Sequence, residues 1–124
     1  MLMKLLNRCL PDEQAVSTTV ADVLAGASGL PPYTYTTPNA VRVGSNAYVW
    51  ARNLLANRLY RTPVLFLEPY VMNSQEVWER VQAGDYEGER VIAGVKRKSI
   101  YREYADAVAE GLRAHYLRVR PITN

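Results

Sequence analysis

The most constraining feature of this sequence is an uninterrupted apolar run, from Val64 to Leu67, between Pro63 and the pair Glu68-Pro69. Because no polar residue breaks the run, neither face of the segment is expected to meet water. That pattern is typical of a central strand in a parallel or mixed sheet covered on both sides. We therefore predict an α/β fold in which a partial mixed or parallel sheet is flanked by helices.

Glu68 stands at the carboxyl end of this predicted strand. Burying a carboxylate costs free energy and adds nothing to packing. In open α/β sheets, ligands bind in the crevice outside the carboxyl ends of the strands. Glu68 is therefore the best candidate in the chain for a catalytic residue. The alternative is an ordinary charged residue at the point where a strand reaches the surface.

Composition limits the classes of protein that this chain can belong to. A hydrophobic content of 48% and a charged content of 22% over 124 residues predict one folded domain rather than a disordered chain. We predict an unstructured or weakly ordered N-terminus over residues 1–11 and a single domain over residues 12–120. The net charge of +3 is mildly basic and suits an anionic polymer such as a cell wall no better than it suits a protein with no charged ligand at all. The basic run at residues 96–98, which we expect to be solvated, is too small to predict nucleic-acid binding.

Cys9 is the only cysteine and His115 is the only histidine. An intrachain disulfide, a cysteine-rich zinc site and a site with two histidine ligands are therefore excluded for this chain alone. Gly111 and Val119 lie four residues either side of His115, so we interpret it as a histidine at a helix end and not as a metal ligand. The sequence predicts neither a signal peptide with a cleavage site nor a transmembrane helix.

Apolar periodicity and capping residues predict four helices. The first begins at Asp12 and ends near Gly26, and the second spans residues 46–60. The third is capped by Asn73 or Ser74 and runs to about residue 81. The last begins at Ser99 and runs to about residue 116, with Gly111 allowing close packing.

Two connections stay ambiguous in the sequence. Residues 91–95 are a short strand or the edge of a buried loop. Residues 33–43 are a polar connection rich in Thr and Tyr, in which Pro38 would confine any strand to an edge. Tyr33 and Tyr35 have the chemistry to stack on a sugar or a base, although we prefer a half-buried surface loop.

The order of these features resembles the C-terminal half of the zinc-dependent N-acetylmuramoyl-L-alanine amidases, the amidase-3 family. The last core strand of that family reads roughly P-x-V-L-V-E-L-G-F-h-S-N, and residues 63–73 read P-V-L-F-L-E-P-Y-V-M-N. The Pro, the apolar strand, the Glu, the aromatic residue two positions later and the Asn five positions later all correspond. Residues 17–31 and 105–112 are similar to the flanking helices, so the resemblance covers most of residues 17–117.

The sequence also departs from the family. Pro69-Tyr70 replaces a Leu-Gly pair, and the predicted helix at residues 46–60 is longer than the usual connection. The family's zinc ligands, two His and one Glu in its N-terminal half, have no counterpart here. The resemblance therefore implies zinc for the family, with none predicted to be held by this chain alone.

The resemblance implies a function in the bacterial cell wall. Enzymes of the family use a zinc-activated water to hydrolyse the amide between the muramoyl lactyl group and L-Ala. It implies Glu68 as the general base and then the acid, with Tyr70 and Asn73 as substrate contacts. The implied ligand is peptidoglycan or a muropeptide, in the periplasm or outside the cell. The implied protein partner is a separate N-terminal half or a second copy of the chain.

We expect the chain to be a truncated or split amidase that is inactive alone. One alternative is a non-enzymatic remnant that binds peptidoglycan or a partner protein through the surface around Glu68, Tyr70 and the Tyr33–Tyr35 loop. Another is a glycosidase in which Glu68 pairs with a second carboxylate, Glu76 or Asp85 being nearest in the sequence.

Overall fold

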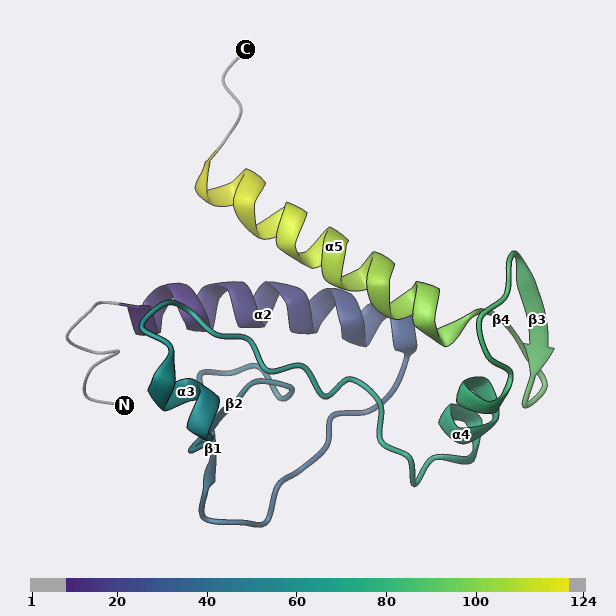
Figure 1. The fold of residues 1–124 in the computed structure, drawn as a ribbon, viewed down its shortest axis with the longest axis horizontal. Coiled ribbons are helices and arrows are strands. Elements are labelled where there is room, and N and C mark those ends of the chain that lie inside the picture. The colour runs from purple at the N-terminus through teal and green to yellow at the C-terminus, as the bar shows by residue number, and fades with distance from the viewer. Residues whose placement is uncertain (1–8, 121–124) are drawn as a thin grey trace.

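The computed structural model describes residues 9–120, which form helices and two small antiparallel sheets (Figure 1). The two long helices are α2 (Cys9–Ser28) and α5 (Ile100–Val119), and the two short ones are α3 (Leu55–Leu59) and α4 (Gln75–Gln82). One sheet pairs β1 (Ala40–Arg42) with β2 (Trp50–Arg52), and the other pairs β3 (Glu89–Ile92) with β4 (Val95–Lys98). The protein is thus a mixture of helices and strands, as predicted at that level of detail.

The core lies where α2 and α5 cross (Figure 1). Its buried apolar side chains are Val16, Val20, Leu24 and Ala107. The two helices approach closely because Gly111 has no side chain: a Cβ there would lie 2.8 Å from the Cα of Val20. The predicted close packing at Gly111 is confirmed. No helix within residues 9–120 is long and apolar enough to cross a membrane.

Three of the predicted helices are confirmed, with adjusted ends. The first begins at Cys9 rather than at Asp12, so residues 9–11 of the predicted loose N-terminus are helical. The remainder of that N-terminus lies outside the described residues. The hydroxyl of Ser74 caps α4 by accepting a hydrogen bond from the Val77 N–H, and Ser99 precedes α5. Capping and apolar periodicity are local signals, which is why the sequence reveals them.

The predicted central strand is wrong. Residues 63–71 adopt no regular secondary structure and belong to neither sheet. Both sheets of the described structure are antiparallel, so the predicted parallel or mixed sheet is absent from residues 9–120. Leu65 and Leu67 pack against the α2–α5 core, whereas Phe66 between them is 58% exposed. The apolar run therefore reflects a single segment buried on one side by helices.

The predicted helix over residues 46–60 is also wrong. This part of the chain contains β2 and the short helix α3, which buries none of its residues. In the antiparallel pairing of β1 with β2, Arg52 is opposite Ala40 and Trp50 is opposite Arg42. Aromatic and β-branched residues such as Val49 and Trp50 favour strands. β1 lies in the connection over residues 33–43, where the sequence allows a short strand. Its pairing with β2 outweighs the helical spacing of apolar residues over 46–60.

The ambiguous region near residue 92 is a β-hairpin. Its register pairs Ile92 with Val95, so Ala93 and Gly94 form the turn. Both have positive φ, 50° and 78°, as a two-residue type I′ turn requires. The basic run at residues 96–98 lies in β4, where Lys96 and Lys98 are exposed, as expected. Arg97 is the exception, because it is only 22% exposed and pairs with Glu76 at 2.9 Å.

Candidate functional site

A cavity of about 1030 Å³ lies beside residues 64–69. One face of α2 contributes small side chains to it, Ser17, Ala21 and Ala25 among them. Residues 64–69 line a second side, and β1, β2 and the loop before them line a third. The cavity therefore lies between residues 64–69 and the β1–β2 hairpin, and one face of α2 closes the remaining side.

Glu68 lies at this cavity, held by two residues that are distant in the sequence. Its Oε2 accepts a hydrogen bond from Arg52 Nη1 at 2.8 Å and another from the hydroxyl of Tyr35. Arg52 Nη1 also lies 3.0 Å from the Tyr35 oxygen, and its guanidinium lies 4.7 Å from the centre of the Tyr35 ring. The side chains of Arg52 and Glu68 are 23% and 48% exposed, so solvent and ligands can reach the pair.

An aromatic wall, formed by Tyr33, Tyr35 and Trp50, stands next to the carboxylate. The ring centroids of Tyr33 and Tyr35 are 5.0 Å apart, and those of Tyr35 and Trp50 are 5.3 Å apart, both edge to face. Burial, followed by the hydrogen bond to Glu68, raises the pKa of Tyr35 above its usual value. The wall, together with Arg52 and Glu68, presents apolar faces and charged groups to the same cavity.

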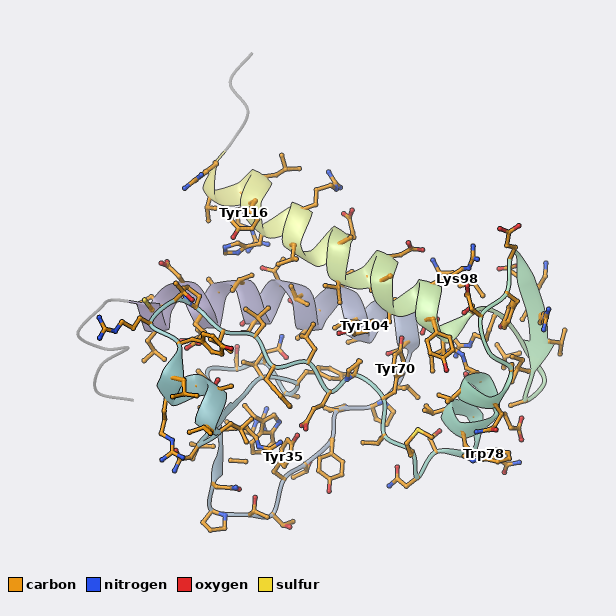
Figure 2. All side chains as sticks on the ribbon, viewed as in Figure 1. Tyr35, Tyr70, Trp78, Lys98, Tyr104 and Tyr116 are labelled. Atoms are coloured by element: carbon orange, nitrogen blue, oxygen red, sulfur yellow. The ribbon has the colours of Figure 1, made fainter. Side chains whose placement is uncertain are left out.

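Tyr70 and Asn73, the two predicted substrate contacts, do not line this cavity. Figure 2 shows Tyr70 beside Tyr104 and apart from Tyr35. The Tyr70 hydroxyl donates to Glu103 Oε1 at 3.0 Å, and burial raises its pKa. Asn73 is exposed in the turn before α4. The structure thus brings Glu68 together with Arg52 and Tyr35, and not with Tyr70 or Asn73.

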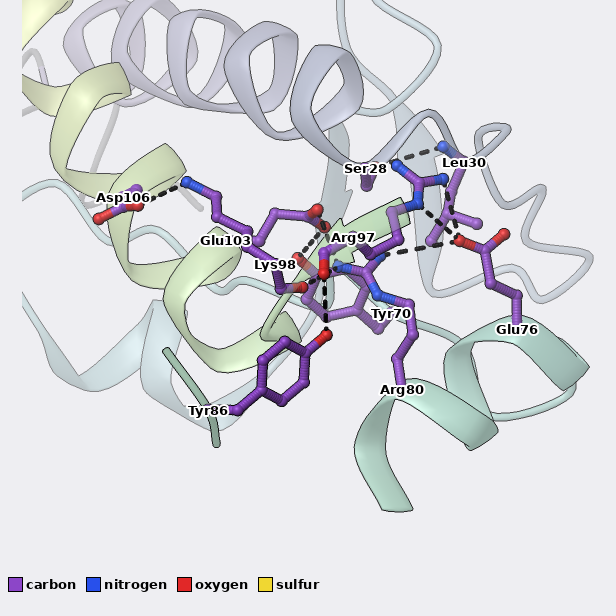
Figure 3. Close-up of polar contacts among 10 residues, drawn as sticks. All are labelled: Ser28, Leu30, Tyr70, Glu76, Arg80, Tyr86, Arg97, Lys98, Glu103 and Asp106. Atoms are coloured by element: carbon purple, nitrogen blue, oxygen red, sulfur yellow. Dashed lines mark hydrogen bonds and ion pairs between the residues drawn. The ribbon is translucent and has the colours of Figure 1, made fainter. Parts of the chain in front are cut away.

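A buried polar cluster anchors the end of the segment that carries Glu68 (Figure 3). Arg80 of α4 is 1% exposed, and its Nη2 lies 2.8 Å from Glu103 Oε2 and 3.4 Å from the carbonyl oxygen of Lys98. Since Glu103 also accepts the hydrogen bond from Tyr70, the cluster joins α4 and α5 to a residue two positions after Glu68. This arrangement anchors the segment to α5 at Tyr70.

The described residues do not offer a ligand set for zinc. Within residues 9–120, no three His, Cys, Asp or Glu side chains gather as metal ligands. His115 is buried near the end of α5, its ring 5.4 Å from that of Tyr116. The two carboxylates considered as glycosidase partners of Glu68 do not line the cavity. Glu76 pairs with Arg97, and Asp85 pairs with Arg102 of α5. The structure therefore does not bring the predicted carboxylate pair together.

Compared with protein-family models, with curated proteins and with solved structures, the chain gives no match. The resemblance to the amidase-3 family therefore rests on the residues quoted for it. The sequence named Glu68 and the Tyr33–Tyr35 loop, but it missed Arg52. A basic residue within a predicted helix carries no signal that its partner lies 16 residues away in another segment.

Proposed function

We propose that this protein binds peptidoglycan in the cavity beside Glu68 and is an amidase-like protein that does not cleave by itself. The observation that carries the proposal is the position of the Glu68–Arg52–Tyr35 group at the edge of a cavity of about 1030 Å³. Ligand sites combine apolar and aromatic walls with a few polar groups that fix orientation. This cavity has both features.

The chemistry of peptidoglycan matches these groups. A sugar ring exposes C–H groups on its face, which pack against aromatic rings such as Trp50, while its edges carry hydroxyl and amide groups that need hydrogen-bond partners. The attached peptide carries amide N–H groups, which can donate to Glu68, and carboxylates, which can accept from the charged Arg52. Glu68 is also the residue that would move a proton in an amidase reaction. We derive no step through zinc, because residues 9–120 present no ligand set for it.

The partial parallel or mixed sheet of the amidase-3 resemblance belongs to the same proposal. In it, residues 63–68 become a strand only when another polypeptide, such as a separate N-terminal half, supplies the neighbouring strands. That polypeptide would also bring the metal ligands. The chain alone would then bind the glycan–peptide strand and leave its amide bonds intact.

The test is binding of purified muropeptides, measured by calorimetry, together with cosedimentation with intact peptidoglycan. We expect Glu68→Gln to weaken binding about tenfold, since hydrogen bonds to a charged group contribute about 1.5–3 kcal/mol. Glu87→Gln is the matched control, because Glu87 is exposed and does not line the cavity. It should bind like the wild type.

Two results would contradict the proposal. If neither muropeptides nor intact peptidoglycan bind, the cavity serves another ligand. If the chain alone releases peptides from peptidoglycan with added zinc, and Glu68→Gln abolishes that release, the protein is a complete amidase and the non-cleaving part of the proposal is wrong.

A further inference from the structure

We propose that the outer side of α3, with the turn that follows it, is a docking surface for an anionic lipid bilayer. The surface consists of Leu55, Leu59, Tyr60 and Arg61, and we call it the α3 surface. None of these four residues lines the cavity beside Glu68. The inference therefore goes beyond the proposed binding of peptidoglycan and does not depend on it.

The first observation is that α3 exposes large apolar side chains instead of burying them. Leu55 and Leu59 are 61% and 67% exposed, and Tyr60 directly after the helix is similarly exposed. The two leucines are four residues apart in a helix, so they lie on the same face. Exposed apolar side chains that occur together, with polar groups around them, mark contact sites for proteins or membranes. This face of α3 is thus available for such a contact.

The second observation is the charge around this face. Residues 23–67 contain four arginines and neither an aspartate nor a glutamate, although the whole chain has 12 acidic residues. Arg58 and Arg61 flank Leu59 and Tyr60 in the sequence. Among residues 9–120, neither of these two arginines takes part in an ion pair. Their charges are therefore open to an external anion.

The third observation is that the α3 surface is tied to the body of the molecule at two points. The side chain of Asn57 in α3 donates to the main-chain oxygen of Arg52 in β2 at 2.7 Å. The carbonyl oxygen of Arg61 accepts a hydrogen bond from Cys9 Sγ, at the start of α2, at 3.2 Å. α3 lies at the end of the molecule where α2 begins, and α4 and the β3–β4 hairpin lie at the other end (Figure 1). A flat bilayer can therefore meet the α3 surface without touching those elements.

Apolar character and charge together select the occupant. A nucleic acid or another anionic polymer would bind the arginines but would leave Leu55 and Leu59 in water. A second copy that docked through the same surface would bring like charges together. An anionic bilayer offers phosphates to the arginines and acyl chains to the leucines, and tyrosine favours the same interface. We therefore assign the α3 surface to a bilayer that contains anionic lipid.

The test is binding of the full chain to large unilamellar vesicles, measured by cosedimentation. One set of vesicles contains phosphatidylglycerol and phosphatidylcholine in equal amounts, and the other contains phosphatidylcholine alone. We expect binding to the anionic vesicles only, and weaker binding at about 0.5 M salt, where surface charges are screened. Arg61→Gln should lower the partition coefficient about fivefold, the contribution of one basic residue near an anionic surface.

A second variant tests the apolar part of the surface. Leu55→Ser combined with Leu59→Ser should lower the partition coefficient about tenfold or more, because the leucines no longer enter the acyl region. α3 buries none of its residues, so this variant should keep the α2–α5 core, which circular dichroism would verify. Arg90→Gln and Val91→Ser are the matched controls, since both residues are exposed and lie in β3 at the other end of the molecule. Each control should bind vesicles like the wild type.

Four outcomes with vesicles would overturn the inference. They are no binding to anionic vesicles, equal binding to both sets, equal losses in Arg61→Gln and Arg90→Gln, and binding that is unaffected when both leucines are replaced. A dimer of the chain that buries the α3 surface would overturn it as well.

A short DNA duplex and muropeptides are the comparison ligands. Binding of the duplex that needs Arg61 but not the leucines would assign the surface to a polyanion and refute the bilayer. Muropeptide binding distinguishes failure of this inference from failure of the proposed function. If muropeptides bind and anionic vesicles do not, only the docking of the α3 surface is refuted.

Discussion

At the scale of single residues, Glu68 and Tyr35 depend on each other. Burial and the carboxylate of Glu68 both raise the pKa of Tyr35. Because the pKa is higher in the folded protein, Tyr35 contributes stability below its usual pKa of 10.0, and this contribution is lost as the pH rises through the folded value. The neutral phenol is the form that donates to Glu68.

Glu68→Gln should therefore lower the pKa of Tyr35, because the neighbouring negative charge is removed while burial remains. A pH titration of the Tyr35 ring signals by NMR measures this directly. Glu87→Gln, which leaves the Glu68–Tyr35 contact in place, should not change the Tyr35 pKa. An unchanged value in Glu68→Gln would mean that the contact does not form in solution.

At the scale of the elements, the crossing of α2 and α5 depends on Gly111. A methyl group there would lie 2.8 Å from the Cα of Val20. The main chain of a packed helix cannot relieve this contact by a rotamer change, as a flexible side chain could. We expect Gly111→Ala to lower the free energy of unfolding by about 1–3 kcal/mol through overpacking. Urea denaturation followed by circular dichroism measures the change.

Gly26 supplies the control for this prediction. It also lies in a helix, α2, but a Cβ there would meet nothing within 4 Å. Gly26→Ala should raise the free energy of unfolding by about 0.5–1 kcal/mol, because alanine favours a helix over glycine. If both alanine variants were stabilised, the two helices would not be packed as closely as the structure has them.

At the scale of the whole molecule, the Arg80–Glu103 pair links α4, α5 and the segment that carries Glu68. Both side chains are buried, and without the charge of Glu103 the nearest carboxylate to Arg80 is that of Glu76, whose Oε1 lies 3.9 Å from Arg80 Nη1. Glu103→Gln should therefore lower the free energy of unfolding by about 3 kcal/mol or more. Glu89→Gln, which removes an exposed partner of Lys96, should change it by less than about 0.5 kcal/mol. Thermal and urea denaturation of both variants would measure the contrast, and equal effects would refute the role of burial.

The sequence predicted the elements whose signals are local. The Ser74 cap lies within α4 and is present. In α5, Tyr104, Val108 and Leu112, spaced four residues apart, pack against the core, whereas Tyr101 is exposed. The run at residues 64–67 carries a different kind of information: it shows that side chains avoid water, but not what covers them. One face is covered by helices, and residues 9–120 supply no strand beside it.

The candidate site was predictable in part for the same reason. Glu68 was identified by its position after an apolar run, and it does lie at a cavity. Its partners, Arg52 and Tyr35, are 16 and 33 residues away. Such a pairing is created when the segment folds onto the β1–β2 hairpin, so no short stretch of sequence records it.

The anchoring of residues 64–70 at both ends has a consequence for chain length. Val64 is bound to Glu13 of α2, and Tyr70 is bound to Glu103 of α5. The two helices are packed against each other, so the span between the anchors is set by the core. A residue inserted into this span would have to bulge outward and would carry Glu68 away from Arg52. The number of residues between Val64 and Tyr70 is thus constrained by the packing of α2 against α5.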